Sequence, residues 1–310
     1  MASICPKLFG ILWLATVWTP AVPAGAVELD DLVAPGTQAE VLGTGYGFCE
    51  GPAADAEGNV YFSDGKNDSI HLYRPGRGVS LFVDDSTDAN GMMFNARGEL
   101  VACEGAAFRV VAFDVETKKK RILIGAGPRQ FNEPNDLTID PAGGFYFTDP
   151  NYKHRGQDPI KPLLVYYASP DGGVTVVSDV CEVPNGILLS ADAKKLYLAD
   201  CRAGVIYKYD VTSPGKLSGE TAWIDLGVHP DGMTQDAAGN LYFACGRAGV
   251  RIYTPDGEPV GAVDGRYGVD YASNCCFGGD DFSTLTITSR DKFLGLGAKV
   301  RGLEPLPRRK

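Results

Sequence analysis

The sequence predicts an all-β, six-bladed β-propeller with a metal-binding channel on its axis. A two-strand unit recurs along the chain, its copies share one turn chemistry, and no sustained helical apolar period is present. A repeat of roughly 40–50 residues built from β-branched and aromatic strands is typical of propeller blades. An ordinary β-sandwich with fortuitous internal similarity is the alternative.

The repeating unit is clearest at Asn132–Pro150, where a short strand, an Asp-Pro-Ala-Gly-Gly turn and a second strand follow one another. Gly, Asp or Asn stands at each hairpin turn, where a positive φ or a side-chain-to-backbone bond is needed. Six copies can be traced, and the residues that close them are 40, 45, 51, 45 and 44 positions apart. These closing residues are Asp64, Glu104, Asp149, Asp200, Cys245 and Ser289.

Oxygen-bearing side chains occur at one phase of this repeat, five residues before each turn. They are Glu50, Asn90, Asn135, Asn185, Asp231 and Asn274. Equivalent positions on successive blades are related by rotation about the axis, and the innermost strands line the channel. We therefore expect the six side chains to converge, although a turn explains any single Asn-Gly or Asp-Gly pair equally well.

Carboxylate and amide oxygens around an open axis are the ligands that calcium prefers, about six to eight of them with water completing the shell. Glu50 and Asp231 bring two negative charges, and Asn135 and Asn185 offer neutral amide oxygens. We expect these four residues to hold calcium, with magnesium or manganese as other oxygen-preferring ions. Zinc suits the set less, because it contains no Cys or His and the chain has no Cys-x-x-Cys spacing.

A cation in the channel would polarise a carbonyl group, and a carboxylate beside it could activate water. Asp231 is the candidate for this general base. The chain has no Gly-x-Ser-x-Gly elbow, which disfavours a serine hydrolase. His229 stands two residues before Asp231 and is expected either near the metal or in a packing role.

Composition indicates a soluble globular protein, with 44% hydrophobic and 22% charged residues. The net charge of −10 disfavours nucleic acid as a partner, because nucleic-acid binding needs a basic surface. The propeller domain is expected at residues 27–304, and residues 305–310 are interpreted as a frayed tail. The basic run Lys118–Arg121 is interpreted as a solvated turn.

Residues 1–26 predict a secretory signal peptide, with a weakly basic start, an apolar run from Phe9 to Val17 and cleavage after Ala26. An uncleaved anchor is the alternative. Cleavage would leave a secreted or periplasmic protein without membrane contact. It would also leave seven cysteines, an odd number that cannot all pair within the chain.

Ring closure is expected from a strand at Ala39–Leu42 that pairs with the C-terminal segment Lys292–Arg301, since pairing the first and last strands hides the sheet edges. The loop Asn151–Pro162 follows a strand end on one rim. Loops on a rim often carry specificity, and whether this one closes over the channel is open.

The motifs at the channel resemble those of the gluconolactonase, regucalcin (senescence marker protein) and luciferin-regenerating-enzyme-like family, and most closely its bacterial gluconolactonase-like branch. They extend over about Gly47 to Arg290. The motifs are Glu50-Gly51-Pro52, Asn132–Asp136, Phe147–Pro150, Pro184–Gly186, Pro230–Gly232 and Phe277–Gly279.

The resemblance implies a divalent metal, commonly calcium, on the axis of a six-bladed propeller. Its ligands would be Glu50, Asn135, Asn185 and Asp231, with Asp231 also acting as general base. The implied activity is hydrolysis of a sugar lactone such as gluconolactone. Relatives hydrolyse other lactones, esters or organophosphorus compounds.

Substrate contacts are expected from Asn90, Glu133, Asn274 and His229. Regucalcin-like members have an Arg where this chain has Glu133, so the sugar specificity is open. Two other functions stay possible: the same scaffold acting on an aryl ester or phosphotriester, and a non-catalytic binding propeller with a structural metal. A condensing role like that of strictosidine synthase is disfavoured, because that branch typically lacks this ligand set.

Overall fold

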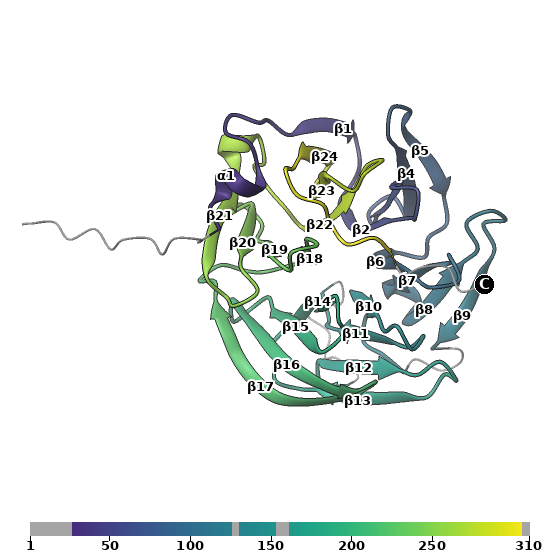
Figure 1. Ribbon diagram of the computed structural model, residues 1–310. Helices are drawn as coiled ribbons and strands as arrows, with labels where there is room; N and C mark the ends of the chain where they lie inside the picture. Colours follow the sequence, from purple (N-terminus) through teal and green to yellow (C-terminus); the bar gives the residue numbers. More distant parts are fainter. Residues whose placement is uncertain (1–26, 126–129, 153–160, 306–310) are drawn as a thin grey trace, which may run out of the picture.

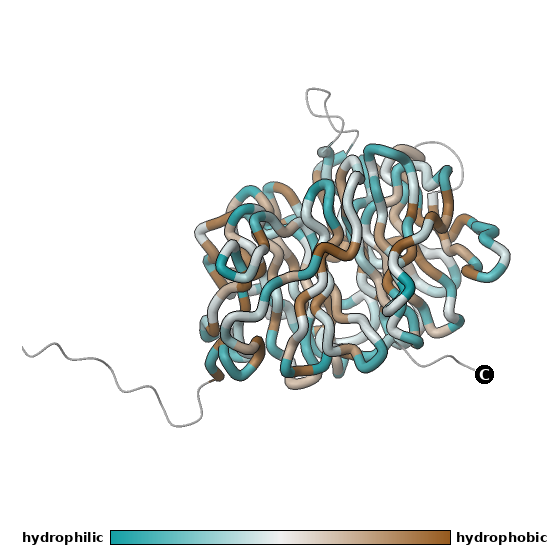
Figure 2. The backbone as a smooth tube through the Cα atoms, turned by 90° about the horizontal axis from the view of Figure 1, so that it is seen from above, coloured by the Kyte–Doolittle hydropathy of each residue, from teal (hydrophilic) through white to brown (hydrophobic). Residues whose placement is uncertain are grey.

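The computed structural model describes residues 27–125, 130–152 and 161–305. Within these residues, six antiparallel sheets of four strands surround a central axis (Figure 1). The predicted six-bladed propeller is therefore confirmed. Viewed from the side, hydrophilic loops and turns lie along both faces of the molecule (Figure 2). The signal-peptide segment 1–26 lies outside the described residues, and its cleavage and the resulting export stay predictions.

Each blade is a four-stranded sheet whose first-named strand lies next to the channel. Blade 1 contains β2 (Cys49–Ala54), β3 (Val60–Asp64), β4 (Ser69–Arg74) and β5 (Gly78–Val83). Blade 2 contains β6 (Ala89–Phe94), β7 (Leu100–Glu104), β8 (Arg109–Phe113) and β9 (Lys120–Ile124). Blade 3 contains β10 (Leu137–Ile139), β11 (Phe145–Asp149), β12 (Leu164–Ala168) and β13 (Val174–Ser178).

The second half of the ring repeats this arrangement. Blade 4 contains β14 (Pro184–Leu189), β15 (Lys195–Asp200), β16 (Val205–Ser213) and β17 (Lys216–Asp225). Blade 5 contains β18 (Met233–Gln235), β19 (Leu241–Ala244), β20 (Val250–Tyr253) and β21 (Pro259–Val263). Blade 6 contains β22 (Asn274–Gly278), β23 (Thr284–Ser289), β24 (Lys292–Gly297) and β1 (Glu40–Thr44). The short helices are α1 (Leu29–Leu32), η1 (Gly105–Ala107) and η2 (Gly265–Tyr267).

The two ends of the chain close the ring in blade 6. β1 pairs antiparallel with β24, from Glu40 opposite Gly295 to Thr44 opposite Lys292. The closing strand begins and ends slightly later than the predicted Ala39–Leu42, and its partner is the first part of the predicted segment. At the seam, Phe62 of β3 stacks on Phe293 of β24 with ring centroids 4.3 Å apart. Backbone pairing thus attaches the N-terminal strand to blade 6, and apolar packing joins blade 6 to blade 1.

The apolar core lies between neighbouring blades. Tyr61 of β3 and Phe94 of β6 meet edge to face with ring centroids 5.3 Å apart, and Leu100 and Val111 of blade 2 are completely buried in the same cluster. Burial of one such side chain contributes roughly 1.5–3 kcal/mol. Because each blade buries its faces only against its neighbours, the positions of residues near the axis depend on the whole ring.

Three of the predicted closing acids hold the loops that lead into the inner strands. Asp64, Asp149 and Asp200 each accept hydrogen bonds from two consecutive backbone N–H groups, at distances of 2.7–3.2 Å. The donors are Gly47 and Phe48, Asn132 and Glu133, and Glu182 and Val183. Each loop reaches a channel residue two or three positions later, so the acids fix where the channel side chains begin.

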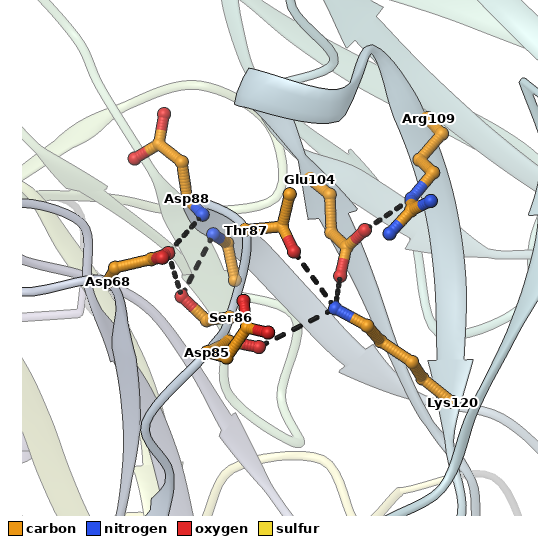
Figure 3. A network of polar contacts seen from close by, with 9 residues as sticks. Asp68, Asp85, Ser86, Thr87, Asp88, Glu104, Arg109 and Lys120 are labelled. Atoms are coloured by element: carbon orange, nitrogen blue, oxygen red, sulfur yellow. Dashed lines mark hydrogen bonds and ion pairs between the residues drawn. The ribbon is translucent and has the colours of Figure 1, made fainter.

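Blade 2 uses its closing acid differently. Glu104 is completely buried and forms ion pairs with Arg109 at 2.5 Å and Lys120 at 2.7 Å. Lys120 also donates to Thr87 at 2.9 Å, so one ammonium group joins the inner-strand loop to β9 (Figure 3). The interpretation of Lys118–Arg121 as a solvated turn was therefore wrong at its end, because Lys120 and Arg121 lie on β9 and pair with Glu104 and Glu99.

After β24 the chain crosses one end of the channel (Figure 1). This is the face that carries the turns between the first and second strands of each blade. Backbone bonds attach this segment to blade 5, through Ala237 N–H and Arg301 C=O at 2.8 Å, and to blade 6, through Gly302 N–H and Phe282 C=O at 2.9 Å. Pro305, which the sequence assigned to the tail, lines the axial cavity with Leu303. The cysteines of the described residues are free thiols. No helix in the same residues combines the length and apolar character that a bilayer crossing requires.

Replacing Asp200 with alanine should destabilise the protein, because four backbone N–H groups would lose their acceptor. We expect the free energy of unfolding to fall by about 2–4 kcal/mol, measured by urea denaturation. Asp84→Ala, at an exposed position, is the control and should change it by less than about 0.5 kcal/mol. Equal small effects in both variants would show that the acid does not hold the loop.

Candidate functional site

The six predicted channel residues, here called the channel ring, lie on successive inner strands or immediately before them. Glycines that follow them allow neighbouring blades to come close. A Cβ atom at Gly51 would lie 1.9 Å from the Asn90 carbonyl oxygen, and one at Gly186 would lie 2.1 Å from the Asp231 carbonyl oxygen. Such distances exclude any side chain, so glycine is required there.

The remaining contacts continue around the axis. Gly91 N–H donates to the Asn135 carbonyl at 2.8 Å, and a Cβ atom at Gly232 would lie 1.9 Å from Cγ of Asn274. Ser273 Oγ donates to the carbonyl oxygen of Cys49 at 2.9 Å, which joins blade 6 to blade 1 beside Glu50. The predicted convergence of the ring is therefore seen in the backbone.

Side-chain contacts bring four ring residues together directly. The Asn185 side chain lies beside the Asp231 carboxylate and favours its charged form, and the Asn274 side chain does the same for Glu50. Burial, together with the nearby charge of Asp231, raises the pKa of Glu50 well above its usual value. Burial also raises the pKa of Asp231, to about 7. A bound cation would remove this cost of holding two carboxylates together.

Asn135 takes its ring position mainly through its backbone. Its N–H donates to the Thr148 carbonyl at 2.9 Å and its own carbonyl accepts from Gly91. The side chain is 5% exposed. This placement agrees with an axial role, while the ligand role itself stays a proposal.

Asp136 is a site residue that the sequence reasoning did not select. Its carboxylate accepts a hydrogen bond from its neighbour Leu137 N–H at 2.9 Å and another from Ile187 N–H in blade 4. Burial raises its pKa to about 7, and its charge raises the pKa of both Glu50 and Asp231. The sequence contained a signal for this residue: four of the other five ring residues are followed by glycine, whereas Asn135 is followed by Asp136.

Tyr152 and Cys201 also contact the site and were not predicted. Asn185 Nδ2 donates to the Tyr152 hydroxyl at 2.9 Å, and the Cys201 thiol hydrogen-bonds with both side chains. Tyr152 begins the loop that was considered as a lid. Residues 153–160 of that loop lie outside the described residues, so the lid question stays open.

The predicted substrate contacts occupy different depths. Asn274 contacts Glu50, and Asn90 is half-buried with its carbonyl accepting from Ser63 Oγ at 3.1 Å. Glu133 is 2% exposed. A Cβ atom at Gly105 would meet its side chain and that of Asp88 at 3.2 and 3.5 Å, so the two acids lie close together.

His229 lies farther from the axis than a position beside the metal, which was one of its two expected places. It is exposed, and its Nδ1 atom is 2.6 Å from the carbonyl oxygen of Cys201. Its place is on the rim rather than beside the two carboxylates.

The donor chemistry of the ring fits a hard cation. Among the described residues, no three His, Cys, Asp or Glu side chains form a group that could hold a metal. The ring instead offers two carboxylates supplemented by amide oxygens, and oxygen-only sets suit calcium or magnesium. Asn185 Nδ2 donates to the Tyr152 hydroxyl, which leaves the amide carbonyl oxygen available as a ligand.

An axial cavity of about 260 Å³ extends from the ring toward the C-terminal segment, bounded by Gly51, Asp136 and Asn274 at one end and by Leu303–Pro305 at the other. Its wall is mainly apolar. Side chains of one blade satisfy inner-strand backbone groups of the next: Ile139 N–H contacts Met93 Sδ at 3.3 Å. The charged groups therefore gather at the ring and not along this apolar wall.

Known proteins are similar to this chain in sequence and fold. The family model described as the SMP-30/gluconolactonase/LRE-like region matches residues 48–291. The chain belongs to this family. A gluconolactonase of Zymomonas mobilis subsp. mobilis is 30% identical over 306 residues, covering 89% of this chain and 85% of that protein.

Other members of the family are similar over most of their length. A pentonolactonase of Haloferax volcanii is 27% identical, covering 82% of this chain and 85% of that protein. A solved gluconolactonase structure from Xanthomonas campestris superposes with a TM-score of 0.78 at 27% identity, covering 87% of this chain and 92% of that one. The family resemblance expected from the channel motifs is confirmed.

The buried carboxylates predict a pH dependence of stability in metal-free protein. Asp231 has its pKa raised from 3.8 to about 7, so between these values the folded state binds more protons than the unfolded state. The free energy of unfolding should therefore decrease as pH rises through this window, measured by urea denaturation in chelator. Added calcium should suppress the decrease.

Asp231→Asn removes one titrating group and should show a shallower decrease than the wild type. Asp84→Asn, at an exposed position, should retain the wild-type slope. Parallel curves for wild type and Asp231→Asn would contradict the assignment of a raised pKa to this carboxylate.

Proposed function

We propose that this protein is a metal-dependent lactonase that opens a sugar lactone of the gluconolactone type. The observation that carries the proposal is the meeting of Glu50, Asp231 and Asn185 at the axis, in a chain that belongs to a family containing lactonases. Gluconolactonase and pentonolactonase relatives cover most of the chain and support the substrate class.

Glu50, Asn135, Asn185 and Asp231 would hold the cation, and their oxygen-only donor set favours calcium. Magnesium, manganese or zinc are the other ions to test. When bound, the cation supplies Lewis acidity that polarises the lactone carbonyl and stabilises negative charge on its oxygen. The protein residues bind the substrate, orient it and move protons.

Asp231 is better placed than Glu50 to act as the general base. Glu50 is 8% exposed, and its carboxylate accepts bonds from Gly51 N–H at 3.2 Å and from Asn274. Asp231 is half-buried and is therefore the more accessible of the two carboxylates. A pKa near the working pH, which burial gives Asp231, suits a group that must accept and return a proton.

The reaction adds one water molecule across the acyl C–O bond of the ring. Asp231 accepts a proton from water as the water oxygen bonds to the acyl carbon. The C–O bond to the ring oxygen then breaks, and Asp231 returns the proton to that oxygen. The product is the open-chain hydroxy acid. Asn90, Glu133 and Asn274 line the approach and are proposed to contact substrate hydroxyl groups, with His229 on the rim.

Two isosteric variants separate metal binding from catalysis. Glu50→Gln should abolish lactonase activity mainly by weakening ion binding, and Asp231→Asn should lower kcat by at least about 100-fold even when the ion is supplied in excess. Calcium binding is measured by calorimetry, and hydrolysis by acid release with gluconolactone as substrate.

Glu116→Gln, in an exposed hairpin of blade 2, is the matched control and should retain both properties. Full lactonase activity in metal-stripped Glu50→Gln protein would refute the proposed mechanism. Calcium-dependent thermal stabilisation without turnover of any lactone, aryl ester or phosphotriester would instead indicate a binding propeller.

A further inference from the structure

The mouth of the channel carries two cations where blades 1 and 6 meet. Lys66 Nζ lies 5.9 Å from the centre of the Phe48 ring, and the Arg290 guanidinium lies 4.4 Å from the centre of the Tyr271 ring. The two rings meet edge to face with centroids 6.4 Å apart. We call these four residues the cationic wall.

The cationic wall is attached directly to the channel ring. Phe48 stands two residues before Glu50, and Tyr271 stands three residues before Asn274. The charges of Asp231 and Glu50 both act on the Tyr271 hydroxyl. A Cβ atom at Gly246 of blade 5 would lie 3.5 Å from the Tyr271 ring, so the ring extends across blade 5 toward the Asp231 side.

Arg290 is held in an uncommon backbone conformation at this position. Its φ of 56° is left-handed, a conformation that costs a residue with a Cβ atom roughly 1–2 kcal/mol. Its carbonyl oxygen accepts the Cys49 N–H at 2.7 Å, one residue before Glu50. The hairpin tip that carries the guanidinium is thus bonded to the strand that carries a proposed metal ligand.

The two cations of the wall form no ion pairs among the described residues. Across the described residues, neither Lys66 nor Arg290 has an ion pair or a side-chain hydrogen bond, whereas Arg109, Lys120 and Arg121 all pair with glutamates. Asp64, which lies near Lys66, already accepts from two loop N–H groups and Asn67. Cation–π contact orients the two cations and leaves their N–H donors available.

A substrate with a negative group at one end would be attracted to the two cations of the wall and oriented by them. A neutral polyol would gain little from two unpaired cations.

We propose that the cationic wall binds an anionic group of the substrate, a carboxylate or a phosphate, so that the enzyme prefers lactones of acidic sugars to neutral ones. The inference rests on the proposed lactonase function. Arg290 presents a planar set of donors that matches either group, and Lys66 adds a second positive charge.

The test compares kcat/KM of the calcium-loaded protein for three lactones: gluconolactone, a glucaric acid lactone and a phosphorylated gluconolactone. We expect at least one acidic lactone to exceed the neutral one by about tenfold or more, the effect of one charge-assisted hydrogen bond. The two acidic lactones distinguish carboxylate from phosphate. Raised salt should lower the preference, since exposed charges are screened.

Arg290→Met should lower kcat/KM for the preferred acidic lactone by about tenfold or more and leave gluconolactone within about twofold. Arg290→Lys should restore part of the loss, because it retains the charge without the fork of donors. Lys66→Met should have a smaller effect of the same sign. Arg247→Met, at an exposed hairpin tip of blade 5, is the control and should leave the preference unchanged.

Equal or lower kcat/KM for both acidic lactones in the wild type would overturn the proposal and leave the lactonase function intact. The proposal would also be overturned if Arg290→Met lowered kcat/KM by the same factor for all three substrates while the melting temperature stayed unchanged. If no lactone is hydrolysed, the lactonase function fails, and calorimetry with glucarate and gluconate on wild type and Arg290→Met decides the binding question alone. Tighter glucarate binding that Arg290→Met removes would support the wall, and equal binding would reject it.

Discussion

The closed ring of blades is the constraint on which the site depends, because it holds like charges together in a buried channel. Burial raises the pKa of Glu50, Asp231 and Asp136, and the charge of Asp136 raises the pKa of the other two further. An isolated pair of strands could not keep them there, because repulsion and desolvation would separate them. The closed ring of blades provides the constraint, since a residue cannot leave the axis without disturbing the core on both sides of its blade.

The polar groups that hold the channel residues in place recur at equivalent positions of the blades. Asp64, Asp149 and Asp200 lie at equivalent strand ends and bind the loops that deliver ring residues. Blade 2 reaches the same result with Glu104 and Lys120, which attach the loop before Asn90 to the outer strand (Figure 3). The proposed cation site would be preorganised, because backbone hydrogen bonds hold the loops that carry its residues.

The two ends of the channel have different chemistry for a physical reason. At the ring end, charged side chains face one another and the surrounding loops carry Tyr152, Cys201 and the cationic wall. Toward the other end the channel wall is mainly apolar, and Leu303–Pro305 cross it. Metal chemistry and substrate selection are therefore proposed on one face only, where the loops are free to vary without disturbing the inter-blade packing.

The sequence by itself determined the number of blades, the strand-turn-strand unit, the closing strand and the phase at which the ring residues occur. It could do so because hydrophobic alternation and turn chemistry are local in the chain. Sixfold rotation about the axis then brings residues at the same position of each repeat to one place. Only the tertiary structure revealed Asp136, Tyr152 and Cys201 at the site and put His229 on the rim, since their contacts join different blades. The cationic wall has the same origin: Lys66 and Arg290 are 224 residues apart in the chain, and closure of the ring alone brings them to one mouth.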